Sequence, residues 1–121
     1  DSEEHMAPVF NALVCIMKKH VSDLAIVTED AEQFYVNTHK QEAKNKAIFF
    51  GMVKKAKEKV AYHLMPVYCN PELLSDISPE LKKKMQGKSC FNFKQQDDTL
   101  FAELDQLTAQ SLADYRRAGK V

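Results

Sequence analysis

The chain has 121 residues and equal numbers of basic and acidic side chains, 17 of each, so its formal net charge is zero. This length fits one domain, and the 45% hydrophobic and 28% charged residues are typical of a soluble globular protein. The charge balance disfavours a general nucleic-acid binder, which usually carries a basic excess. No apolar run approaches a membrane span and no signal-peptide core is visible, so we expect a cytoplasmic protein without membrane association.

The chain should begin with a helix. Residues 1–6 are polar and aperiodic, and we expect them to be disordered or vector-derived, with a single domain spanning 7–121. Pro8 suits a first helical position, so the helix is predicted over 8–21. Its apolar stripe consists of Phe10, Leu13, Val14, Met17 and Val21.

Four strand patterns follow. They cover residues 24–28, 34–38, 48–53 and 60–64, and the polar stretch 39–46 reads as an exposed hairpin connection. Gly51 interrupts the third strand and indicates a bulge or a close approach of two backbones. Pro66 lacks a backbone N–H and should end the fourth strand.

Capping residues divide the remainder of the chain. Asn70 and Ser78, each followed by Pro-Glu, predict the starts of two short helices. Gly87 is the expected end of the second, and 89–94 reads as a fifth strand. Asp97 or Asp98 should cap a long helix, and Gly119 stands where that helix is expected to end.

This order predicts an α+β fold. We expect an antiparallel sheet of about five strands, with the N- and C-terminal helices packed on one face and two short helices before the last strand.

Two runs resemble a known family. They are HLMPVYCNPELL (63–74) and SPELKKKMQGKSCFNF (78–93), and they are similar to the YdhG-like domain family of uncharacterised, mainly bacterial proteins. The resemblance extends from about Pro8 to Tyr115. It implies a frataxin-like broad fold and no particular reaction. Frataxin-like proteins bind iron through acidic residues on the first helix, but 8–21 contains no Asp or Glu, so iron donation is not expected.

The cysteines leave one enzymatic alternative open. Cys15, Cys69 and Cys90 are odd in number and lack CxxC spacing, which disfavours a disulfide framework. A cation at Lys88 could lower the pKa of Cys90, and His63 could act as its base, as in a cysteine-dependent enzyme. No His or Cys spacing is typical of a metal site, so neither a metal nor a cofactor is predicted.

The preferred hypothesis is a non-enzymatic module that binds a small ligand or a partner protein. Its candidate site comprises His63, Tyr68, Lys88, Cys90 and Asn92. There, His63 and Asn92 would orient the ligand by hydrogen bonds, Lys88 would attract an anionic group and Tyr68 would form a wall. The protein is expected to be a monomer or a homodimer.

Two lysine groups support a second alternative, weak nucleic-acid binding. They are Lys54, Lys55, Lys57 and Lys59, and Lys82, Lys83, Lys84 and Lys88. Both could form a local positive surface despite the neutral net charge. No stacking aromatics are interleaved with them in the sequence, so nucleic acid is the less favoured partner.

Overall fold

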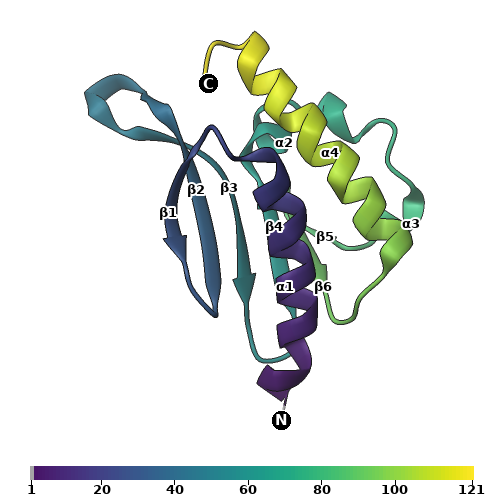
Figure 1. The fold of residues 1–121 in the computed structure, drawn as a ribbon. Coiled ribbons are helices and arrows are strands. Elements are labelled where there is room, and N and C mark those ends of the chain that lie inside the picture. The colour runs from purple at the N-terminus through teal and green to yellow at the C-terminus, as the bar shows by residue number, and fades with distance from the viewer. Residues whose placement is uncertain (1) are drawn as a thin grey trace.

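The structure is a computed structural model that describes the backbone of residues 2–121 and, except at positions 2–5 and 43, their side chains. It is an α+β fold with a six-stranded antiparallel sheet in the order β1-β2-β3-β4-β6-β5 (Figure 1). The strands are β1 (Ala25–Glu29), β2 (Gln33–Gln41), β3 (Ala47–Lys55), β4 (Val60–Leu64), β5 (Met85–Gln86) and β6 (Cys90–Phe93). The helices are α1 (Ser2–His20), α2 (Met65–Cys69), α3 (Pro79–Lys82) and α4 (Asp98–Arg117), with 3-10 turns η1 (Ala43–Asn45) and η2 (Pro71–Leu74).

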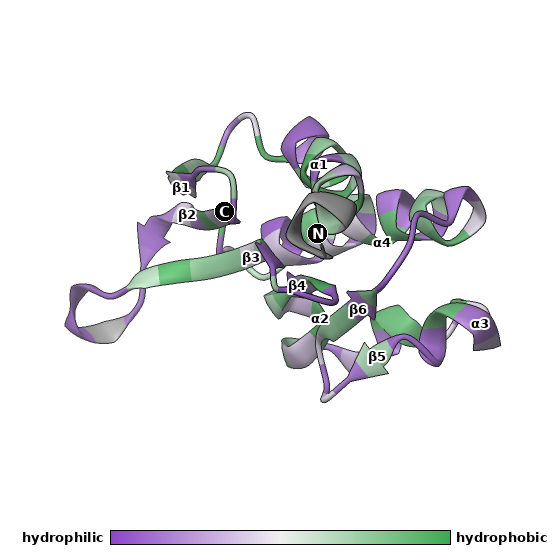
Figure 2. Cartoon of the chain, turned by 90° about the horizontal axis from the view of Figure 1, so that it is seen from below, coloured by the Kyte–Doolittle hydropathy of each residue, from purple (hydrophilic) through white to green (hydrophobic). Residues whose placement is uncertain are grey.

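Both long helices pack on the same face of the sheet, as predicted. Figure 2 shows α1 and α4 side by side above β3, β4 and β6, and hydrophobic residues lie between the helices and the sheet. The alternation of β4 explains this arrangement, because Val60, Tyr62 and Leu64 are fully buried while Ala61 and His63 are half-buried. Among residues 2–121, no helix combines the length and apolarity that crossing a membrane requires.

Hydrogen bonds connect the helices to the sheet inside this core. The hydroxyls of Tyr62 and Thr108 lie 2.6 Å apart, and Thr108 donates to the carbonyl of Leu104 at 2.7 Å. Tyr62 therefore donates to Thr108, since that hydroxyl hydrogen is already used. Near the other end of α4, the Tyr115 hydroxyl donates to the carbonyl of Phe49 at 2.7 Å. Each hydrogen bond gives a partner to a polar group that would destabilise the folded protein if it were buried without one.

The N-terminal helix begins earlier than the sequence predicted. It spans Ser2–His20, so Pro8 lies inside the helix and does not start it. Met6 and Val9 are each only 3% exposed and belong to the core. Because they lie three residues apart on one helical face, their burial favours a helix that continues through the proline. The expectation for residue 1 lies outside the described residues.

The predicted caps and the third strand are confirmed. Asn70 accepts from the N–H of Glu72, and Ser78 accepts from that of Leu81. Asp97, the first of the two acidic candidates, caps α4. Gly51 lies beside a register shift between β2 and β3, and a Cβ there would meet the His63 carbonyl oxygen at 2.7 Å. The sequence thus indicated both the bulge and the close backbone approach.

Short elements account for the other differences. The prediction of five strands omitted β5, which has only two residues and so shows no alternation. The helix capped by Ser78 ends at Lys82, and Gly87 instead lies between β5 and β6 with a φ of 80°. Glycine tolerates this left-handed conformation, which a turn between two paired strands uses as readily as a helix end does. A further short helix, α2, contains Pro66 in its first turn.

Candidate functional site: the open face and the basic hollow

The candidate site begins with the face of the sheet that points away from α1 and α4, which we call the open face. Strand pairing assigns to it Ala25, Thr28, Gln33, Tyr35, Asn37, Phe49, Met52, Lys54, Ala61, His63, Gln86, Cys90 and Asn92. All of these residues are half-buried or exposed, whereas their neighbours on the helix face are mostly buried. None of them is Asp or Glu, and Lys54 contributes a full positive charge.

Three rings form a continuous strip across the open face, which we call the aromatic strip. Tyr35 on β2 and Phe49 on β3 are stacked, with centroids 4.8 Å apart and an interplanar angle of 28°. The imidazole of His63 on β4 follows at 5.3 Å from the Phe49 ring. The three rings are half-buried, so each retains exposed surface on the side away from the core. The Phe49 and His63 rings are tilted by 44°, and the faces of Tyr35 and Phe49 turn toward each other, so the strip offers a partly apolar surface made largely of ring edges.

His63 and Cys90 face each other on β4 and β6, as the enzymatic alternative requires. The Nε2 atom of His63, however, lies 3.1 Å from the hydroxyl of Ser89. Burial lowers the pKa of His63 and raises the pKa of the Cys90 thiol, against which the nearby Lys59 charge acts in the opposite direction. Both shifts favour the neutral forms, and a neutral thiol is a poor nucleophile.

Native-state alkylation should reveal this protection. We expect iodoacetamide near neutral pH to modify the exposed Cys15 and Cys69 before the half-buried Cys90, because a raised pKa lowers the thiolate fraction. Peptide mass spectrometry measures the three rates, and unfolded protein serves as the control in which the rates converge. Cys90 reacting first in the folded protein would contradict this assignment and favour the cysteine-enzyme alternative.

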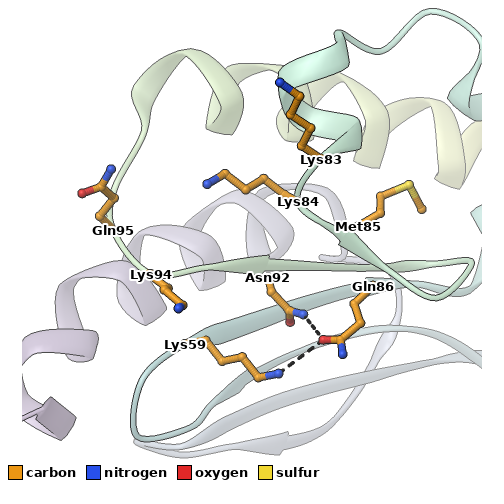
Figure 3. A pocket seen from close by; sticks show the side chains of 8 residues that line it. All are labelled: Lys59, Lys83, Lys84, Met85, Gln86, Asn92, Lys94 and Gln95. Atoms are coloured by element: carbon orange, nitrogen blue, oxygen red, sulfur yellow. Dashed lines mark hydrogen bonds between the residues drawn. The ribbon is translucent and has the colours of Figure 1, made fainter.

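A hollow of 660 Å³ lies at one end of the open face and shares Gln86 and Asn92 with it (Figure 3). We call it the basic hollow. It is lined by Lys59, Lys83, Lys84, Met85, Gln86, Asn92, Lys94 and Gln95. The lysines come from three connections: between β3 and β4, between α3 and β5, and after β6. Folding thus joins Lys59 of one lysine group to Lys83 and Lys84 of the other.

The hydrogen bonds inside the hollow leave its charge uncompensated. The side-chain oxygen of Gln86 accepts from Lys59 Nζ at 3.3 Å and from Asn92 Nδ2 at 2.5 Å (Figure 3). Gln86 is neutral, so it orients Lys59 without neutralising it. Among the described side chains, no carboxylate lies within ion-pair distance of the four lining lysines. The hollow is therefore positively charged, although the chain as a whole is neutral.

The structure divides the five residues of the predicted ligand site. His63, Cys90 and Asn92 share the open face, and of the five only Asn92 lines the basic hollow. Tyr68 and Lys88 lie together elsewhere: Tyr68 is 54% exposed, and Lys88 Nζ is 5.9 Å from its ring centroid. The predicted roles of Tyr68 as a wall and Lys88 as an anion attractor therefore do not belong to this hollow.

Several residues of the candidate site were not identified from the sequence. They are Tyr35, Phe49, Gln86, Lys94 and Gln95. Tyr35 carried a usable signal, because the alternation of β2 places an aromatic ring among polar residues opposite the buried Phe34 and Val36. Lys94 and Gln95 gave none, since they follow the last strand and only the tertiary fold brings them to Lys59.

Within the described part of the chain, no three side chains of His, Cys, Asp or Glu come together in a group that could hold a metal ion. A comparison with protein-family models found no match, and comparisons with curated proteins and with solved structures found none either. These comparisons neither support nor contradict the expected resemblance to the YdhG-like family.

Proposed function

We propose that this protein is a non-enzymatic binding module and that its basic hollow holds an anionic ligand. One observation carries the proposal: four lysines from three connections line a single hollow whose other residues are Met85, Gln86, Asn92 and Gln95. Ammonium groups bind phosphate and carboxylate oxygens as compact charges, and amide side chains add directional hydrogen bonds. A site with this donor set and no carboxylate favours an anion with several oxygen atoms.

The arrangement of donors supports a polyphosphate-like or polycarboxylate ligand over a single small ion. In the view of Figure 3, Lys59, Lys84 and Lys94 surround Asn92 from different directions. The hollow is wide and open to solvent, so one small ion could not contact all of these donors at once. Asn92, predicted as a ligand-orienting residue, keeps that role here, with its orientation fixed by the bond to Gln86.

Calorimetric titration with inorganic tripolyphosphate tests the proposal. The unaltered protein should bind this probe, and affinity should fall as salt rises from about 50 to about 200 mM. The double variant Lys84→Gln/Lys94→Gln should bind it at least about tenfold more weakly, because each lost charge-assisted contact is worth about 1 kcal/mol or more.

The matched control is Lys44→Gln/Lys46→Gln, which removes the same charge from the exposed β2–β3 connection. It should bind tripolyphosphate like the unaltered protein. Equal weakening by both double variants would show that net charge alone determines binding, and the hollow would lose its assigned role.

A further inference from the structure

We infer that the ligand of this surface is a single-stranded nucleic acid, whose phosphates contact the basic hollow while its bases pack against the aromatic strip. The inference rests on the proposed function, because it assigns a chemical class to the anion held by the hollow. It adds the open face, which binding of a small anion would leave unused.

The hollow and the strip form one continuous track. Asn92 in the hollow lies two residues from Cys90 on β6, and Cys90 is paired directly with His63 on β4. From His63 the track continues to Phe49 at 5.3 Å and then to Tyr35 at 4.8 Å. Neighbouring strands are about 4.8 Å apart, so the path from β6 to β2 covers about 15 Å. In a four-stranded RNA-recognition sheet, aromatic side chains contact two or three bases of a single strand.

The chemistry of the track matches both parts of a nucleotide. Base faces pack against aromatic rings, edge-on as well as face-on, without sequence preference, and lysines bind the phosphates between them. Lys54, which lies on the open face opposite Ala61, extends the positive charge from the hollow toward β3. None of the residues that strand pairing assigns to the open face is Asp or Glu, so a polyanion would meet no repulsion from them.

Two other occupants fit the track less well. A second copy would place one positively charged hollow and its Lys54 against another open face that also carries no acidic side chain. Like charges across an interface are costly, so self-association through this face is disfavoured. An acidic peptide would satisfy the lysines, but its carboxylates would gain nothing from the partly apolar aromatic strip.

Fluorescence anisotropy with labelled oligothymidylate and oligouridylate of about ten nucleotides tests the inference. Both probes should bind at about 50 mM salt and weaken steeply as salt is added. The variant Tyr35→Leu/Phe49→Leu should lose about tenfold or more of the oligonucleotide affinity while keeping that for tripolyphosphate. Preference between the two probes distinguishes a DNA ligand from an RNA ligand.

Three controls distinguish the loss of contact between bases and rings from a loss of protein structure. Tyr35→Phe/Phe49→Tyr keeps both rings and should retain oligonucleotide binding. Tyr68→Leu removes an exposed ring outside the strip and should also leave the affinity unchanged. Retained tripolyphosphate binding in each variant shows that the fold persists.

Four results would overturn the inference. They are unchanged oligonucleotide affinity in the leucine variant, equally tight binding of a duplex, equally tight binding of an oligoglutamate of the same length, and no oligonucleotide binding at low salt. If tripolyphosphate still binds in a Lys84- and Lys94-dependent manner, each of these contradicts nucleic acid and leaves the proposed function standing. The proposed function fails separately if the variant Lys84→Gln/Lys94→Gln binds tripolyphosphate as tightly as the unaltered protein does.

Discussion

Gly51→Ala is expected to destabilise the protein by about 3 kcal/mol, the upper part of the usual range for overpacking. A Cβ at position 51 would lie 2.7 Å from the carbonyl oxygen of His63 and 2.9 Å from the terminal methyl of Met17. Met17 could adopt another rotamer, but the His63 carbonyl belongs to the backbone of β4. Relieving that contact requires β3 and β4 to separate at the centre of the sheet. Urea denaturation followed by circular dichroism measures the loss.

Gly87→Ala is the matched control for this substitution. Gly87 has a φ of 80°, but an added Cβ there meets no atom within 4 Å. The control should therefore cost only about 1 kcal/mol, for the left-handed backbone of a residue with a side chain. Equal losses in the two variants would mean that crowding between β3 and β4 is not what requires glycine at position 51.

Phe50→Ala should destabilise the protein by about 4 kcal/mol, because it removes a large buried side chain and leaves a cavity. The Phe50 ring is 0% exposed and packs edge-on against Tyr115 with centroids 5.9 Å apart. Tyr115 also donates to the backbone carbonyl of Phe49, so relaxation of α4 into the cavity would strain that hydrogen bond. The expected loss is thus near the middle of the range for phenylalanine truncation.

Phe49→Ala provides the comparison, since it makes the same chemical change one residue earlier on the opposite face. Its ring is only half-buried on the open face, and the expected loss is about 1 kcal/mol. Chemical denaturation of both variants under identical conditions gives the difference. Losses of similar size would contradict the assignment of Phe49 to the open face, and with it the aromatic strip.

Local signals in the sequence were sufficient for most of the fold. Alternation in β4 separated Tyr62 from His63 correctly, and side-chain caps located the starts of η2, α3 and α4. The start of α1 was placed too late because Pro8 is an equally good first residue in isolation. Only the burial of Met6 against the tertiary core favours the longer helix. The two-residue β5 is defined by its pairing with β6, which no local pattern reports.

The candidate site was harder to predict, since its residues are contributed by distant segments. Local sequence grouped His63, Tyr68, Lys88, Cys90 and Asn92. Tyr68 lies in α2 and Lys88 in the turn between β5 and β6, and neither lines the hollow with Asn92. The lysine groups were visible, yet their meeting depends on how α3 and the connection after Lys55 approach β6. Nucleic acid was disfavoured in the sequence because no aromatics are interleaved with the lysines. The rings that the proposed nucleic-acid binding would use, Tyr35 and Phe49, come from β2 and β3, far from the lysines in sequence.

The most direct test of a shared binding surface is a titration of ¹⁵N-labelled protein followed by amide chemical shifts. Tripolyphosphate should shift the amides of the basic hollow, with Asn92 and Lys94 among the largest changes. A single-stranded oligonucleotide should shift the same amides and also those of Tyr35, Phe49 and His63 on the open face. Shifts concentrated on α1 and α4, or scattered without relation to the hollow, would contradict the account.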